Sequence, residues 1–312
     1  MAELAYLQVS RVCNQKCVFC SNPDNGKIIS WESATSLIDS FAAGGAPGVI
    51  LTGGEPTLFP RLDELVAYAV AKGLPPRLIT NGQRTSDLGY LRSLFTAGLA
   101  QMHVSVHSHK PEVQAAVSQN RRSLDGVRRT LRNAAELGLR IDVNTVINTS
   151  NADHLSGLVR WVAQHAPHVE HFVWNNLDPL LNRASLNPSI IPRLRDFEVE
   201  LHKAMTWLAE TGRTFRVERV PLCFMSDFPH SSTETRKIIK DEQRRIYFLD
   251  DKGLKEQNQS SWHYGKSERC SGCSVNGICA GLYQMDVYYS SDELCPLFVD
   301  AGEVSRRVLE NI

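Results

Sequence analysis

The chain has 312 residues, enough for one large domain or two ordinary ones. Lys plus Arg and Asp plus Glu each number 34, so the net charge is zero and the composition indicates neither a nucleic-acid partner nor an anionic membrane surface. No apolar run approaches the roughly 20 residues of a membrane span. The N-terminus also lacks the basic and apolar regions of a secretory signal, which predicts a cytoplasmic protein.

Short apolar or β-branched runs alternate with helical patterns from residue 4 to about residue 220. The six predicted strands are residues 4–9, 48–52, 76–80, 102–106, 140–147 and 170–174. Helical patterns begin near Trp31, Arg61, Asp87, Arg121 and Asp153, and a sixth runs from Ile190 to Thr211. Because the strands are mostly apolar on both faces, a parallel sheet with right-handed crossovers is predicted.

The ends of the helices are marked by side chains that cap helices. Ser30 and Ser86 stand where an N-cap is expected. The expected left-handed C-terminal caps, each just ahead of a strand, are Gly44, Gly73, Gly98 and Gly138.

Candidate functional residues follow at least four of the predicted strands: cysteines after the first, GGEP after the second, TNG after the third and HSH after the fourth. Convergence at the C-terminal ends of the strands is typical of a barrel mouth. We therefore predict a partial (β/α)6 barrel of the TIM type over residues 1–215, with an open doubly wound sheet as the alternative fold.

The pattern changes after the segment RTFRVERVPLC at residues 213–223. Residues 226–269 are polar, with a basic helical stretch expected at 234–247 and a loop at 255–268. A cysteine cluster follows, so residues 216–312 are expected to form a small cysteine-rich domain held by metal, starting between 213 and 225.

Eight cysteines in a chain without an export signal indicate metal binding rather than disulfides. Cys13, Cys17 and Cys20 form a C-x3-C-x2-C motif in the loop that leaves the first predicted strand. Three thiolates are one short of a closed zinc site, and no histidine lies within the loop. A [4Fe–4S] cluster with one iron open to a non-protein ligand is the first hypothesis.

The sequences CNQKCVFC and GGEPTLFP resemble the radical S-adenosylmethionine (SAM) superfamily, over about residues 4–220. The resemblance implies that Cys13, Cys17 and Cys20 hold the cluster, whose remaining iron binds SAM. The SAM-binding residues that it implies are Phe19, Gly53, Gly54, Glu55, Pro56, Ser105 and Asn144. Phe19 would lie by the adenine and Glu55 would face the methionine amino group, because a carboxylate suits an ammonium. For Ser105 and Asn144 the alternative is a polar residue at the barrel end without cofactor contact.

The resemblance also implies the chemistry. A 5′-deoxyadenosyl radical made from SAM would abstract hydrogen from a peptide or small-molecule substrate, with electrons from flavodoxin or ferredoxin. Only 12 residues precede Cys13, so either a separate protein binds a peptide or the substrate is small. No catalytic acid or base is assigned. Side chains that could face the barrel interior are His103, His107, Trp174, Asn175 and Asn176.

A second motif, C-x2-C-x5-C, comprises Cys270, Cys273 and Cys279. Spacing alone allows a zinc ribbon, but ERCSGCSVNGICAG resembles the auxiliary-cluster regions called SPASM and Twitch, which implies one auxiliary [4Fe–4S] cluster. Cys223 is the favoured fourth ligand, which would leave Cys295 as a buried thiol, and Cys295 is the alternative ligand. The rival functions are a non-catalytic iron–sulfur electron carrier and a zinc-stabilised binding module.

Overall fold

The computed structural model describes residues 4–180, 183–242, 244–250, 253–258 and 263–310. Its main sheet has nine strands in the order β7-β6-β5-β4-β3-β2-β1-β8-β9. These strands are β1 Leu4–Ser10, β2 Val49–Gly53, β3 Pro76–Thr80, β4 Gln101–Ser105, β5 Arg140–Ile147, β6 His171–Asn176, β7 Thr214–Glu218, β8 Arg244–Asp250 and β9 Gly253–Asn258. All neighbouring pairs are parallel except β8 with β9, and a second sheet pairs β10 Tyr264–Gly265 with β11 Leu282–Tyr283.

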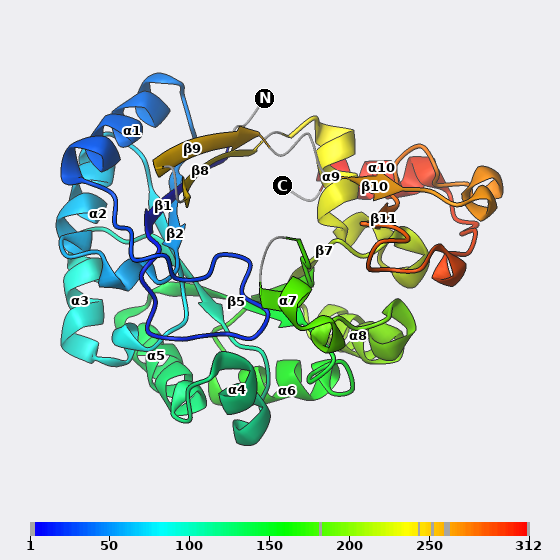
Figure 1. Ribbon diagram of the computed structural model, residues 1–312, viewed down its shortest axis with the longest axis horizontal. Helices are drawn as coiled ribbons and strands as arrows, with labels where there is room; N and C mark the ends of the chain where they lie inside the picture. The colour runs from blue at the N-terminus through cyan, green and yellow to red at the C-terminus, as the bar shows by residue number, and fades with distance from the viewer. Residues whose placement is uncertain (1–3, 181–182, 243, 251–252, 259–262, 311–312) are drawn as a thin grey trace.

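Helices cover the outer face of the curved main sheet (Figure 1). The described helices are α1 Trp31–Ala43, α2 Leu62–Ala71, α3 Leu88–Thr96, α4 Pro111–Ser118, α5 Ser123–Leu137, α6 Leu155–His165, α7 Arg183–Leu186, α8 Leu194–Glu210, α9 Thr233–Lys240 and α10 Ala301–Glu310. Alternate strand residues such as Leu7, Leu78 and Val104 join helix residues such as Ile38 and Leu65 in the main core. The other face of each strand is left for the interior of the barrel.

The order of strands decides between the two predicted folds. From β1 to β7 each strand lies beside the next one in sequence, without the reversal that marks a doubly wound sheet. The partial TIM-type barrel is therefore confirmed, and the sheet is wider than the six predicted strands. All six are present as β1 to β6.

The C-terminal part contributes to the barrel sheet. The expected boundary at 215/216 falls inside β7, and β8 returns from the C-terminal part to pair with β1. Two local predictions are wrong, because residues 244–247 are strand rather than helix and residues 255–258 are strand rather than loop. β9 is the edge strand, where charged side chains are tolerated and hide the apolar pattern, and β8 lies next to it, between β9 and β1. Residues 259–262 of the predicted loop lie outside the described residues.

The caps differ from prediction at two positions. Ser30 caps α1 as expected, but the cap of α3 is Asp87, whose carboxylate accepts from the Tyr90 N–H at 2.9 Å. Ser86 instead donates to the Gln83 carbonyl. Gly44 has a φ of −78°, and the left-handed turn falls one residue later.

Among the described residues, none of the helices has both the length and the apolar character required to cross a bilayer.

Candidate functional site

A cleft of about 300 Å³ opens at the C-terminal ends of the barrel strands. The predicted site residues that line it are Cys13, Cys17, Phe19, Cys20, Gly53, Gly54, Glu55, Ser105 and Asn144. Pro56 is the exception, because it is buried at the start of the 3-10 turn Pro56–Leu58 and is not among the lining residues. Four separate segments of the chain are thus brought to one cleft by the parallel sheet.

The loop with the three N-terminal cysteines is pinned from several sides. Val18 N–H donates to the Val117 carbonyl at 2.9 Å, and Arg183 Nη1 donates to the Cys17 carbonyl at 3.1 Å. Burial raises the pKa of Cys13 to about 11 and that of Cys17 to about 12. Thiolates in this loop therefore need compensating positive charge, which bound metal supplies.

The glycines of GGEP are required by a close approach of two backbone segments. Gly54 N–H donates to the Ser10 carbonyl at 2.6 Å, and Glu55 N–H donates to the Val12 carbonyl at 2.9 Å. At Gly53, where φ is +150°, a Cβ would lie 1.9 Å from the Ser10 carbonyl oxygen. The GGEP turn is thereby fixed to the loop that carries Cys13, a reason for glycine beyond ligand approach.

The Glu55 carboxylate is 1% exposed and accepts four hydrogen bonds from the chain. Oε1 accepts from the Thr57 N–H, the Thr57 hydroxyl and the Thr80 hydroxyl, and Oε2 accepts from the Asn81 N–H at 2.8 Å. Burial raises the pKa of Glu55, and these bonds oppose that rise. Since a carboxylate has about four acceptor sites, the single bond to Oε2 leaves that oxygen with capacity for a ligand.

Asn81, from the TNG segment, connects the GGEP turn with the loop that carries the N-terminal cysteines. Its amide Nδ2 donates to Asn14 Oδ1 at 2.7 Å, while its backbone N–H contacts Glu55. The side chains that follow β1, β2 and β3 therefore form one hydrogen-bonded wall of the cleft.

The opposite wall comes from β4, β5 and β6. Asn175 Nδ2 donates to Asn144 Oδ1 at 2.5 Å, and Ser105 lies beside Asn144 in the β4–β5 register. Asn176 and His107 also line the cleft. His103 and Trp174 do not.

His103 lies deeper on β4 and contacts Asp142 at 3.3 Å, whereas Trp174 belongs to the outer core and meets Phe215 edge-on. The lining residues that escaped the sequence analysis include Asp178 and Arg219, which form an ion pair at 3.7 Å. Each follows the end of a strand, β6 or β7, and that position was the available signal.

The remaining cysteines meet in a second cavity. It is lined by Cys223, Cys270, Cys273, Cys279 and Cys295. Burial raises the pKa of Cys223 to about 12, and the neighbouring Cys295 and Cys279 thiols also act on it. Cys295 is exposed, so the expectation that it is a buried thiol is wrong. Both candidates for the fourth ligand thus stand at the same cavity as the C-x2-C-x5-C triplet.

In the described part of the chain, no three His, Cys, Asp or Glu side chains are arranged to hold a single metal ion. A [4Fe–4S] cluster has a different requirement, because its cysteines bind different iron atoms. The three cysteines of the C-x3-C-x2-C motif and the cysteines at the second cavity, which number at least four, are donor sets that fit such clusters.

The fold and the cleft define a partial TIM-type barrel with a three-cysteine site at its mouth. The family model of the radical SAM superfamily matches residues 7–162, and the chain belongs to this superfamily. Members hold a [4Fe–4S] cluster and SAM.

Curated proteins of known name are similar to part of this chain. The chain is 32% identical over 193 residues to a PqqA peptide cyclase of Xanthomonas axonopodis pv. citri, a match that covers 59% of this chain and 50% of the relative. The chain therefore spans about half the length of the curated relatives it matches.

Solved structures share the fold. Streptococcus suis SuiB bound to S-adenosylmethionine matches with a TM-score of 0.65 and 14% identity, over 90% of this chain and 73% of SuiB. The anSMEcpe enzyme with bound AdoMet and a peptide matches with a TM-score of 0.64 and 16% identity, over 99% of this chain and 96% of that one.

Proposed function

We propose that this protein is a radical SAM enzyme that cleaves SAM and abstracts hydrogen from a peptide or small-metabolite substrate. The observation that carries the proposal is the meeting of the three-cysteine loop with GGEP, Ser105 and Asn144 in one cleft. A cluster held by Cys13, Cys17 and Cys20 supplies, when bound and reduced, the electron that breaks the S–C5′ bond of SAM.

The residues of the chain would bind and orient SAM and the substrate. Glu55 Oε2 would accept from the methionine ammonium of SAM; in support, the other oxygen is occupied by Thr57 and Thr80, whereas Oε2 accepts a single bond. Ser105, Asn144 and Asn175 present hydroxyl and amide groups on the opposite wall for polar atoms of SAM or substrate. Phe19, which is buried, offers an apolar ring for the adenine.

Two observations favour a peptide as substrate. Several of the curated relatives are named PqqA peptide cyclase, and the solved anSMEcpe structure contains a peptide. A peptide also suits a cleft whose described lining includes both an amide-rich wall and the Asp178–Arg219 pair. A flavodoxin or ferredoxin would supply electrons, and the cytoplasm, where thiols stay reduced, would be the compartment.

The second cavity supports an auxiliary [4Fe–4S] cluster held by Cys223, Cys270, Cys273 and Cys279. Cys223 lies in the turn Leu222–Phe224, just after β7, and Arg219 of the same segment lines the SAM cleft. A four-thiolate cluster there has no iron open to substrate, so its roles are electron transfer or structure. Residues 216–312 remain the proposed auxiliary region.

The test is iron content and SAM cleavage of the anaerobically reconstituted protein. We expect about eight irons from two four-iron clusters. Changing Cys13, Cys17 and Cys20 together to Ala should remove about half of this iron and abolish 5′-deoxyadenosine formation.

Two results would contradict the proposal. One is 5′-deoxyadenosine formation by the triple variant. The other is a wild-type protein that holds iron but forms no 5′-deoxyadenosine under reductant, which would favour the non-catalytic electron carrier. Zinc in place of iron at the second cavity would favour the zinc-stabilised module for that region.

A further inference from the structure

Just beyond the end of β4, a side chain takes the place of a backbone acceptor in the hydrogen bonding of the sheet. Beyond the last paired residue, Ser105, one more backbone bond joins Val106 N–H to the Asn144 carbonyl at 2.9 Å. In a parallel ladder the next donor, Val146 N–H, would reach the Val106 carbonyl. It donates instead to His107 Nδ1 at 3.2 Å, and the Thr145 hydroxyl takes the Val106 carbonyl. The imidazole therefore completes the β4–β5 ladder.

This bond fixes the tautomer of His107. Since Nδ1 accepts, its lone pair is used and the ring proton of the neutral form is on Nε2. Burial lowers the pKa of His107 to about 4, so the ring is neutral at physiological pH. His107 lines the SAM cleft, and among the described residues no acceptor is paired with Nε2. The ring thus offers the cleft one donor of fixed direction.

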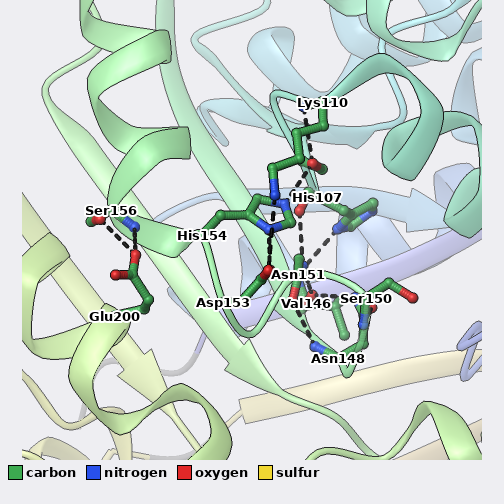
Figure 2. Close-up of polar contacts among 11 residues, drawn as sticks. His107, Lys110, Val146, Asn148, Ser150, Asn151, Asp153, His154, Ser156 and Glu200 are labelled. Carbon is green, nitrogen blue, oxygen red and sulfur yellow. Dashed lines mark hydrogen bonds and ion pairs between the residues drawn. The ribbon is translucent and has the colours of Figure 1, made fainter.

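The position of the ring is held by its surroundings. His107 N–H donates to Gln114 Oε1 at 2.9 Å. The His107 carbonyl accepts from Asn151 Nδ2 at 2.8 Å (Figure 2). The Phe19 ring meets the imidazole edge-on, with centroids 4.7 Å apart. A donor constrained on these sides loses little freedom when it binds a ligand.

The hydrogen-bonded side chains next to His107 help to hold its loop in place and do not form a second active site. Ser108 Oγ lies 2.7 Å from His154 Nε2. On the other side of the same ring, His154 Nδ1 contacts Asp153 (Figure 2). The order of groups is that of a hydrolase triad, but Ser108 is fully buried while the Asp153 side chain is 74% exposed. A buried hydroxyl cannot act as a nucleophile on an external substrate. These three side chains therefore serve to connect the loop after β4 with the loop after β5.

We propose that His107 Nε2–H donates a hydrogen bond to an acceptor atom of the adenosyl part of bound SAM. This inference rests on the proposed function. The Phe19 ring beside His107 gives an apolar surface for a flat heterocycle, and Ser105 and Asn144 supply polar groups nearby. The charged methionine end suits the Glu55 wall, on the far side of the cleft. His107 thereby distinguishes adenosyl ligands from free methionine.

Two substitutions separate the two roles of the ring. His107→Asn places an amide oxygen near the position of Nδ1, so the ladder acceptor is retained and the cleft donor is lost. His107→Gln places an amide N–H near the position of Nε2, so the donor is retained and the ladder acceptor is lost. His107→Gln should therefore unfold more readily than His107→Asn. His107→Asn, in turn, should bind SAM more weakly than His107→Gln.

The measurement is calorimetric binding to anaerobically reconstituted protein, with SAM, 5′-deoxyadenosine and methionine as probes. We expect His107→Asn to weaken SAM and 5′-deoxyadenosine by about 2- to 12-fold, the effect of one hydrogen bond, and to leave methionine unchanged. His107→Gln should bind all three probes within about twofold of wild type. His103→Asn is the matched control, because His103 is on β4, the strand that leads to His107, but outside the cleft lining.

Unchanged SAM affinity in His107→Asn would overturn the proposal. So would an equal loss for methionine, because the donor would then serve the other end of the ligand. A wild-type protein that binds no SAM at all would instead contradict the proposed function, which keeps the two failures distinct.

Discussion

At the scale of single residues, Glu55 shows how one side chain serves both fold and site. A carboxylate beside an ammonium explains ligand binding, but the structure adds two threonine hydroxyls and two backbone N–H groups that depend on it. Three of the four donors come from the Thr57 turn and the end of β3, at Thr80. Glu55 therefore also fixes the relative position of two loops.

Glu55→Gln should lower the free energy of unfolding by about 1–3 kcal/mol, because the amide NH2 that replaces one oxygen cannot accept from a buried donor. SAM affinity of Glu55→Ala should fall about 10- to 150-fold, through loss of a charge-assisted hydrogen bond of roughly 1.5–3 kcal/mol. Denaturant unfolding and calorimetry measure the two effects. Glu64→Gln is the control, since Glu64 is exposed and pairs with Arg61 at the surface. Wild-type SAM affinity in Glu55→Ala would reject the ligand contact.

At the scale of elements, β7 connects the two cysteine sites. Glu218 ends the strand, Arg219 lines the cleft at the barrel mouth with a left-handed φ of +60°, and Cys223 reaches the second cavity. Arg219 N–H donates to Glu234 Oε2 at 3.1 Å, which anchors this sharp turn to α9. A short segment of one strand exit therefore sets the separation of the two sites.

The ligand set of the second cavity is testable in a background that lacks Cys13, Cys17 and Cys20. Cys223→Ala should remove or convert the electron paramagnetic resonance signal of the auxiliary cluster and lower its iron, because a protein ligand is lost. Cys295→Ala is the matched control, since this exposed thiol lines the same cavity, and it should keep both signal and iron. A changed signal in Cys295→Ala alone would assign the fourth ligand to Cys295.

At the scale of the whole molecule, buried and half-buried histidines couple the fold to pH. Burial lowers the pKa to about 4 in each of His103, His107, His171 and His230. A neutral buried histidine stabilises the fold above its ordinary pKa of 6.5, and this contribution is lost as the pH falls toward 4. Burial also raises the pKa values of Glu55, Asp142 and Glu234, and these carboxyls act in the opposite direction.

The histidines outnumber the opposing carboxyls, so the unfolding midpoint of the metal-free protein should fall between pH 7 and pH 5. His171→Asn should lose less over this interval, because one histidine that must be charged on unfolding is absent. Thermal unfolding at a series of pH values measures both slopes. His171 suits this test because it lies outside the described lining of the SAM cleft and contacts the Thr214 hydroxyl at 2.7 Å. Equal slopes for variant and wild type would show that His171 is not kept neutral by burial.

The sequence by itself predicted the alternation of strands and helices and the residues at the cleft from Cys13 to Asn144, because these depend on local periodicity and short motifs. The strand order in the tertiary structure then decided for the barrel over the doubly wound sheet. It could not reveal β9, whose edge position permits charged residues, or β8, which lies between β9 and β1. It also missed the cap at Asp87, one residue after the predicted Ser86. Only the tertiary structure decided that Cys223 and Cys295 share a cavity, that Glu55 binds two loops and that His107 completes the sheet. These are contacts between segments tens of residues apart, and the closure of the barrel, which no local pattern encodes, sets their distances.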